Sequence, residues 1–305
     1  MIDLHVHSTF SDGTCTPEEL VELGASAGLS AMALTDHDTT EGVPHFLAAA
    51  RAHGVRAVSG VELSVDVPGV VVHLLAYGCD PGNASLCSAL ARIRESRHRR
   101  NVEIIGKLVR LGCCITWKDV VDAAGDEGVV ARPHFAQALV KRGYARGKQD
   151  AFRRYLAKGA AAYADRFRLA PEDALRLVAD ASGVSSLAHP TLCNLAPAAL
   201  RDLVARLAAA GLGGIEAYYT GHHQEQVNAL LRLADEFHLV PTGGSDFHGA
   251  ATPEIRVGTA FGALKVPDES FDRLLERLPG RPNETARSEI APYPEIAAKR
   301  ITEPR

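Results

Sequence analysis

The chain begins with MIDLHVHSTFSDG (residues 1–13), in which a short apolar run carries two histidines. Side chains two residues apart on an extended strand point to the same face, so His5 and His7 project together. Asp12 follows in the loop after this strand. Imidazole and carboxylate groups without cysteine are typical ligands of Zn²⁺, Mn²⁺ or Fe²⁺. The stretch therefore predicts the first ligands of a metal centre at the end of a strand.

Beyond this stretch, short apolar runs alternate with helix-like segments. The next helix is expected to begin after Thr16 as its N-cap, with Pro17 at the first helical position. Further strands are expected at 30–35, 57–65, 70–77, 184–188, 214–218 and 239–243. Alternation of this kind predicts an α/β fold with a mostly parallel sheet, either open or closed into a barrel.

One long segment interrupts the alternation. Residues 85 to about 163 contain almost no strand signal and are interpreted as a helical insertion between two barrel strands. We therefore expect a barrel domain formed by residues 1–84 and 166–278, with the insertion at 85–165. Residues 279–305, which are rich in Pro, Glu and Arg, are expected to form a surface tail.

Residues that commonly bind metals recur at the ends of the predicted strands. Active sites of barrels and open α/β sheets form at the carboxyl ends of the strands, so this position is informative. The residues concerned are His37, Glu62, His73, His189, Asp246 and His248, with His134 inside the insertion. About ten such groups are too many for one ion. They predict two or three ions, with a carboxylate such as Glu62 bridging them.

The composition restricts the class of protein. The chain has 305 residues, is 46% hydrophobic and carries a net charge of −4, which argues against broad coating of nucleic acid. Six cysteines without a CxxC pair are expected to be reduced thiols. The first residues lack the apolar core of a signal peptide, and no apolar run reaches the ~20 residues of a membrane helix. We therefore expect a cytoplasmic protein with no membrane association.

Several motifs together resemble the signature of the PHP (polymerase and histidinol phosphatase) family. They are DLHVHS with SDG, LTDHDT, GVELS, AHP and GGSDFHG, spread from residue 1 to about 260. The resemblance implies a distorted seven-stranded (β/α) barrel, a trinuclear metal centre and phosphoester hydrolysis. The metal ligands it implies are His5, His7, Asp12, His37, Glu62, His73, His134, Asp246 and His248. It leaves His189 as a ligand or an acid close to the metals, and Asp36 and Asp38 as residues that orient His37.

Within the family, the helical insertion resembles the nucleotide phosphatase and exoribonuclease branch. This implies hydrolysis of the 3′-phosphate of 3′,5′-bisphosphonucleosides, pAp to AMP and phosphate, and also action on short 5′-phosphorylated RNA. The expected mechanism is attack by a hydroxide shared between two ions, with His189 or Asp246 protonating the leaving group. Manganese is the first expectation for the metal, with iron and zinc as alternatives. No stable protein partner is implied.

The insertion also suggests contacts to an anionic substrate. In ARIRESRHRRN (91–101), helical spacing places Arg97 on an apolar stripe with Arg100 close by, while Arg99 lies on another face. Arg132 lies two residues before His134 and is the stronger candidate for a phosphate contact. A solvent-exposed basic face remains the alternative for each arginine. The remaining candidates are Ser8 for substrate binding and Tyr218, or its neighbour Tyr219, for base stacking.

Three alternative functions remain open from the sequence. A histidinol-phosphate phosphatase would use the same chemistry, but an amino-alcohol substrate calls for an acidic subsite and the insertion offers arginines. Another amidohydrolase-like reaction is compatible with the barrel, although no lysine in a ligand-bearing strand offers a bridging carbamate. A non-catalytic, metal-dependent binding module would be expected to lack ligands, yet every motif is filled.

Overall fold

The computed structural model describes residues 1–124, 130–259 and 264–279 and contains one seven-stranded sheet. The strands follow each other in chain order and are β1 (Ile2–Val6), β2 (Ala31–Leu34), β3 (Arg56–Val67), β4 (Val70–Tyr77), β5 (Val184–Leu187), β6 (Gly214–Tyr219) and β7 (Val240–Gly244). Strands β1 to β3 are parallel, as are β5 to β7, whereas β4 is antiparallel to both of its neighbours.

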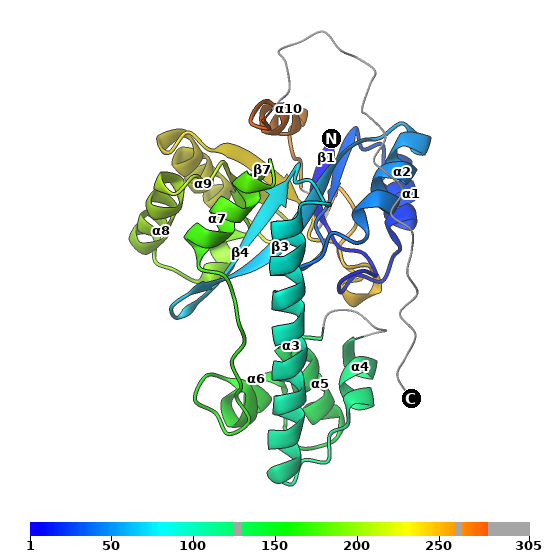
Figure 1. The fold of residues 1–305 in the computed structure, drawn as a ribbon, viewed down its shortest axis with the longest axis vertical. Helices are drawn as coiled ribbons and strands as arrows, with labels where there is room; N and C mark the ends of the chain where they lie inside the picture. Colours follow the sequence, from blue (N-terminus) through cyan, green and yellow to red (C-terminus); the bar gives the residue numbers. More distant parts are fainter. Residues whose placement is uncertain (125–129, 260–263, 280–305) are drawn as a thin grey trace.

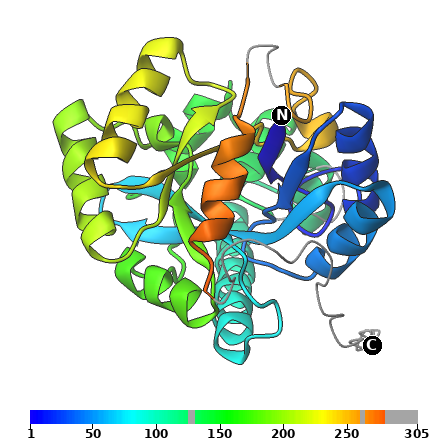
Figure 2. The same cartoon turned by 90° about the horizontal axis from the view of Figure 1, so that it is seen from above.

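The two edges of the sheet approach each other. The backbone N–H of Asp246, just after β7, donates to the carbonyl of His5 at 2.8 Å, and that of His7 donates to Phe247 at 2.9 Å. These bonds join the end of β1 to the segment after β7 and make a nearly closed barrel (Figure 2). The predicted distorted barrel of mostly parallel strands is therefore confirmed.

Helices surround the barrel and cover one of its ends. The helices on the outside are α1 (Pro17–Ser26), α2 (Val43–His53), α7 (Pro171–Asp180), α8 (Pro197–Ala209) and α9 (Gln224–Glu236). Helix α10 (Asp268–Glu276) buries Phe271 and Leu274 against Ile2 and Tyr77 and so covers the amino ends of the strands (Figures 1 and 2). Two short 3₁₀ turns, η2 (Pro190–Cys193) and η3 (Gly249–Ala251), follow β5 and β7.

The start of α1 shows how the sequence sets a local boundary. The Thr16 hydroxyl accepts a hydrogen bond from the backbone N–H of Glu19 at 3.2 Å, and the Glu19 carboxylate accepts from the backbone N–H of Thr16 at 2.8 Å. This reciprocal pair satisfies two N–H groups that the first helical turn leaves free, and Pro17 lacks an N–H to satisfy. The helix start predicted from Thr16 is confirmed.

The segment between β4 and α7 is helical, as predicted, and most of it extends below the barrel (Figure 1). It contains α3 (Ala84–Arg110), α4 (Trp117–Ala124), α5 (Arg132–Lys141), α6 (Lys148–Ala151) and the π-helical turn η1 (Phe152–Leu156). The first half of α3 buries Leu86 and Leu90 in a barrel core, whereas its second half packs Ile104 and Leu108 with Phe135 in a core of its own. Helix α3 thus spans both cores, and the division at residue 85 stays a prediction.

Two further expectations concern the chain as a whole. No helix within the described residues is long and apolar enough to cross a membrane. The predicted tail lies, from residue 280 onward, outside the described residues.

Candidate metal centre

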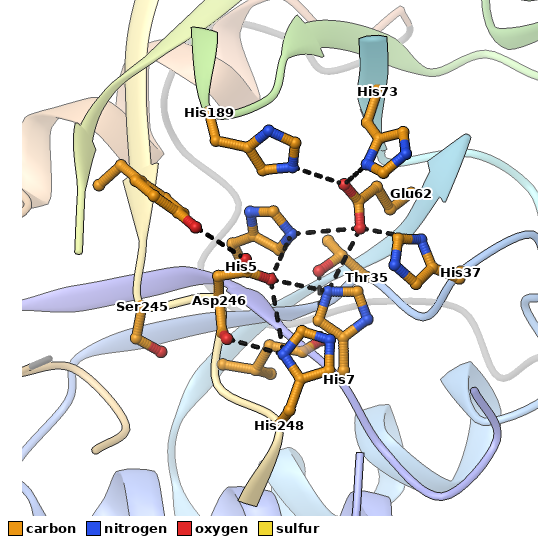
Figure 3. Close-up of polar contacts among 12 residues, drawn as sticks. His5, His7, Thr35, His37, Glu62, His73, His189, Ser245, Asp246 and His248 are labelled. Carbon is orange, nitrogen blue, oxygen red and sulfur yellow. Dashed lines mark hydrogen bonds and ion pairs between the residues drawn. The ribbon is translucent and has the colours of Figure 1, made fainter. Parts of the chain in front are cut away.

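The metal-binding residue types gather at the end of the barrel opposite α10. His5 lies near the end of β1 and His7 directly follows that strand, while His37 follows β2, His189 follows β5, and Asp246 follows β7. Strand β4 runs in the opposite direction, so its first half reaches this end and brings in His73, paired in register with Ser64 of β3. Figure 3 shows these side chains converging on Glu62 of β3 from different strands.

Glu62 lies at the centre of the group and is buried. Its two carboxylate oxygens face different sets of imidazoles. Oε2 lies near His37 Nδ1 (3.0 Å), His7 Nε2 (3.3 Å) and His5 Nε2 (3.4 Å), while Oε1 lies near His73 Nδ1 (2.7 Å) and His189 Nε2 (3.0 Å). A carboxylate whose two oxygens lie near two different groups of histidines has the arrangement expected of a ligand that bridges two ions.

One group of four has the dimensions of a metal site. His5 Nε2 and His7 Nε2 lie 3.3 and 3.2 Å from Asp246 Oδ1, and 3.4 and 3.3 Å from Glu62 Oε2. Ligand atoms at about 2.0–2.2 Å from a tetrahedral Zn²⁺-like ion are separated by roughly 3.3–3.6 Å. Both Nε2 atoms are buried and have no hydrogen-bond partner among the described residues. The nitrogen and oxygen donors and their spacing therefore fit a divalent ion.

Two further groups adjoin the first. One contains Asp12 and His248 with His7 and His37, and the other contains His73 with His37 and Glu62. Asp12 Oδ1 lies 3.4 Å from His248 Nε2, and Asp12 Oδ2 lies 3.8 Å from His37 Nε2. The three groups share residues, and within each group the ligand atoms lie within 4.8 Å of one another. This arrangement is consistent with more than one ion; the number and identity of the ions stay predictions.

The cluster holds its carboxylates ionised. Burial acts to raise the pKa values of Glu62 and Asp246, but the neighbouring histidines outweigh it and hold both pKa values well below the usual range. Burial dominates for His37 and lowers its pKa to about 4. At His7, burial acts to lower the pKa, but the neighbouring carboxylates of Asp246 and Glu62 outweigh it and raise the pKa to about 10. The carboxylates of Glu62 and Asp246 are therefore ionised at neutral pH, the state in which a carboxylate binds a cation.

Three residues at the site have strained backbones. His189, Asp246 and Asp38 have φ values of 27°, 56° and 54°, in the left-handed region that non-glycine residues rarely adopt. His189 and Asp246 are the predicted catalytic residues. His189 hydrogen-bonds Glu62 from beside the ligand groups, whereas Asp246 belongs to one of them. Strain held at such positions is typical of functional sites.

Asp36 and Ser8 have a different role from the one expected. The Asp36 carboxylate accepts from the backbone N–H of Ser8 at 2.7 Å and from the hydroxyls of Ser8 and Ser11 at 2.6 and 2.5 Å. Ser8 is buried, so its hydroxyl is committed to Asp36 and does not face a substrate. The expectation that Ser8 binds substrate is corrected, because Asp36 and Ser8 instead fix the loop between His7 and Asp12.

Arg99 and Arg100 lie on different faces of α3, as helical spacing predicted. Arg99 is exposed and pairs with Glu95 at 3.2 Å on the outer face of α3. This corrects the expectation that Arg99 contacts the substrate. Arg97 donates to the carboxylate of Asp38, beside His37. Arg100 is only 4% exposed and pairs with no carboxylate among the described residues. Burial, followed by the charges of Arg97 and Arg132, lowers the pKa of Arg100 to about 9.

Arg132 and His134 lie at the start of α5. Arg132 donates to the carbonyl of Leu156 at 3.3 Å, and its guanidinium lies 5.5 Å from the ring centre of Tyr163. His134 Nδ1 accepts from the backbone N–H of Ala131 at 3.2 Å. His134 belongs to none of the three ligand groups, and burial lowers its pKa against the charge of Asp12. The role of His134 as a metal ligand therefore stays a prediction.

Tyr218 and Tyr219 point to opposite faces of β6. Tyr218 packs against the core beside α10, and burial raises the pKa of its hydroxyl. Tyr219 donates its hydroxyl to Asp246 Oδ2 at 3.0 Å, and its ring centre lies 5.6 Å from that of His189. Successive strand residues alternate in direction, which explains the difference. The prediction for Tyr218 is therefore corrected, because Tyr219 is the tyrosine at the site.

Sequence reasoning did not identify Arg166 or Glu216. Arg166 lies 3.8 Å from Asp38 and is almost fully buried, and only its proximity to the end of the insertion could have indicated it. Glu216 is fully buried on β6, and its carboxylate accepts from His5 Nδ1 at 2.8 Å. The one available signal was an acidic residue inside an otherwise apolar strand run, GGIEAYY.

Comparison with known proteins gives consistent matches. A family model described as PHP domain matches residues 3–81. A 3′,5′-nucleoside bisphosphate phosphatase from Chromobacterium violaceum is 33% identical over 247 residues, covering 81% of this chain and 87% of that protein. A 5′–3′ exoribonuclease from Haemophilus influenzae is 34% identical over 246 residues, covering 81% and 89%. A crystal structure named as a metal-dependent phosphoesterase from Bifidobacterium adolescentis matches with 32% identity and a TM-score of 0.75, covering 90% and 96%.

Proposed function

This chain belongs to the PHP family and is a metal-dependent phosphoesterase, and we propose that it removes the 3′-phosphate of 3′,5′-bisphosphonucleosides. The observation that carries this proposal is a group of buried arginines beside the metal centre. Arg97, Arg100 and Arg166 have only the Asp38 carboxylate as a close counterion among the described residues. A second anion, besides the phosphate at the metal centre, would balance the excess positive charge.

The arginines are close enough to affect one another. The charges of Arg97 and Arg132 act on Arg100, and burial together with Arg97 lowers the pKa of Arg166 to about 9. Arg97 Nε, Arg100 Nε and Arg166 Nη1 are buried without a hydrogen-bond partner in the part of the chain that the structure describes. Because Asp38 adjoins His37, the second anion would lie next to the metal centre. Two neighbouring phosphate sites match a nucleoside with phosphates on its 3′ and 5′ positions.

The residues at the centre support hydrolysis. His5, His7, Asp12, Glu62 and Asp246 would hold divalent ions, which supply Lewis acidity and lower the pKa of water when bound. His189 Nε2 lies at the edge of the cluster, where Glu62 and other carboxylates raise its pKa against the effect of burial. A proton held at this nitrogen is positioned for transfer to the 3′ oxygen of the ribose as it leaves.

Short 5′-phosphorylated RNA is the second candidate substrate. The arginine group would hold a 5′-phosphate in the same way whether the nucleotide ends in a 3′-phosphate or continues as a chain. The exoribonuclease from H. influenzae supports this candidate. A histidinol-phosphate phosphatase is less well supported, because the cationic amino-alcohol would meet arginines of the same charge.

The test is phosphate release from pAp in the presence of Mn²⁺, compared with 3′-AMP, histidinol phosphate and a short 5′-phosphorylated RNA. We expect pAp to be the best small substrate and Asp246→Asn to abolish its turnover. Arg100→Gln should raise KM for pAp by about 10- to 100-fold, corresponding to the loss of a charge-assisted hydrogen bond to phosphate. It should change KM for 3′-AMP little, because that substrate lacks the 5′-phosphate.

Arg99→Gln is the matched control, because Arg99 is one residue away but exposed and paired with Glu95. It should leave both KM values unchanged. Equal turnover of pAp and 3′-AMP by the wild-type protein would contradict the two-phosphate proposal. Preferential cleavage of the RNA would favour the second candidate. Metal binding without any turnover would support the non-catalytic alternative.

A further inference from the structure

We infer that Glu216 is a positioning residue of the metal centre, which fixes the ring orientation of His5 and the backbone of His189. Neither role depends on the identity of the substrate. Glu216 lies on β6 and is 0% exposed, and it belongs to none of the three ligand groups. Its carboxylate is therefore described best by the residues that it contacts.

The two oxygens of Glu216 have different partners. Oε1 lies 2.8 Å from His5 Nδ1, and Oε2 accepts from the backbone N–H of His189 at 2.5 Å. His5 extends from β1 and His189 follows β5, so one carboxylate on β6 links three segments inside the barrel. Both histidines present their Nε2 atoms to Glu62, at 3.4 and 3.0 Å.

The contact with His5 sets the tautomer of that ring. A carboxylate only accepts hydrogen bonds, so the hydrogen of a neutral His5 ring must lie on Nδ1. Nε2 then carries the lone pair and points at Glu62 and Asp246, which is the state required of a metal ligand. A carboxylate behind a ligating imidazole also increases the basicity of the ring.

The contact with His189 opposes backbone strain. His189 has a φ of 27°, which a residue with a side chain adopts only when its surroundings enforce it. The short bond from its N–H to Glu216 supplies part of that constraint. Without it, we expect the His189 ring to lose its fixed distance from Glu62.

Glu216→Gln tests the inference with almost no change in volume. Glutamine has one oxygen, so one of the two donors must face an amide N–H group. We expect the apparent Kd for Mn²⁺ or Zn²⁺ to rise by about 10- to 100-fold, the usual effect of losing such a partner. The measurement is competition with a chromophoric chelator together with metal content per chain, made without substrate. Failure of the proposed substrate assignment would leave this result unchanged.

Asp3→Asn is the matched control for burial of a carboxylate. Asp3 is also 0% exposed, but it accepts from the backbone N–H groups of His5, Ser245 and Gly258 and has no imidazole nitrogen as a hydrogen-bond partner. We expect Asp3→Asn to lower the melting temperature of the metal-free protein with little change in metal affinity. An unchanged Kd for folded Glu216→Gln protein would overturn the inference, as would an equal loss of affinity in both variants.

Discussion

At the residue scale, Tyr218 and Tyr219 of β6 show that neighbouring residues of one strand have different roles. Tyr219 donates to Asp246 Oδ2, while Asp246 Oδ1 faces the Nε2 atoms of His5 and His7. The hydroxyl therefore fixes which carboxylate oxygen is offered to the metal site. Tyr218 has no such contact, because its side chain leaves the opposite face of the strand.

This difference predicts unequal effects of removing the two hydroxyls. Tyr219→Phe should lower kcat/KM about 10-fold, since a hydrogen bond to a charged group contributes about 1.5–3 kcal/mol. Tyr218→Phe should have almost no effect. The measurement is steady-state phosphate release by the two variants and the wild-type protein. Equal effects would show that Tyr219 does not hold Asp246 in its active orientation.

At the scale of elements, Asp38 attaches the insertion to the barrel. It follows β2 and receives Arg97 from α3 and Arg166 from the segment before α7. The guanidinium of Arg94 on α3 also donates a hydrogen bond to the backbone carbonyl of Asp38 at 2.9 Å. Burial acts to raise the pKa of Asp38, but the charges of Arg97 and Arg166 outweigh it and lower the pKa below its usual value. The loop that carries His37 therefore also anchors the insertion.

Asp38→Asn should lower the free energy of unfolding at neutral pH by about 3–5 kcal/mol, because it leaves buried arginines without their counterion. A lowered pKa means that this contribution is present above the unfolded value of about 3.9 and is lost as the pH falls through the folded pKa. The difference between wild type and variant should therefore shrink below about pH 4. Urea unfolding at several pH values measures it. Asp173→Asn, at an exposed pair with Arg176, is the control and should cost under about 1 kcal/mol.

At the scale of the whole molecule, the metal centre brings together strands that are far apart in the sequence. Its ligand groups come from β1, the loops after β1, β2 and β7, and the paired strands β3 and β4. The insertion contributes no residue to these groups within the described part of the chain. Bound ions should therefore stabilise the barrel and leave the second half of the insertion largely unaffected.

Metal removal tests this separation. At a free metal concentration 100 times Kd, one site adds about 2.7 kcal/mol to the unfolding free energy. Chelation should lower the melting temperature and increase hydrogen exchange in β1, β3 and the segment after β7. Amides of α5 should exchange at nearly the same rate with and without metal. A uniform increase over the barrel and the insertion would contradict this view and indicate that the two unfold as one unit.

The sequence alone predicted the alternating strands and helices, the insertion and the positions of the metal-binding residue types. These features are local: strand periodicity puts His5 and His7 on one face, and the parallel order puts their counterparts at the same barrel end. The tertiary structure decided which of two neighbours faces the centre, as for Tyr218 and Tyr219. It also decided the partners of Ser8 and Arg97 and revealed Glu216. The physical reason is that burial and pairing depend on register and on chain segments distant in sequence, which no local pattern records.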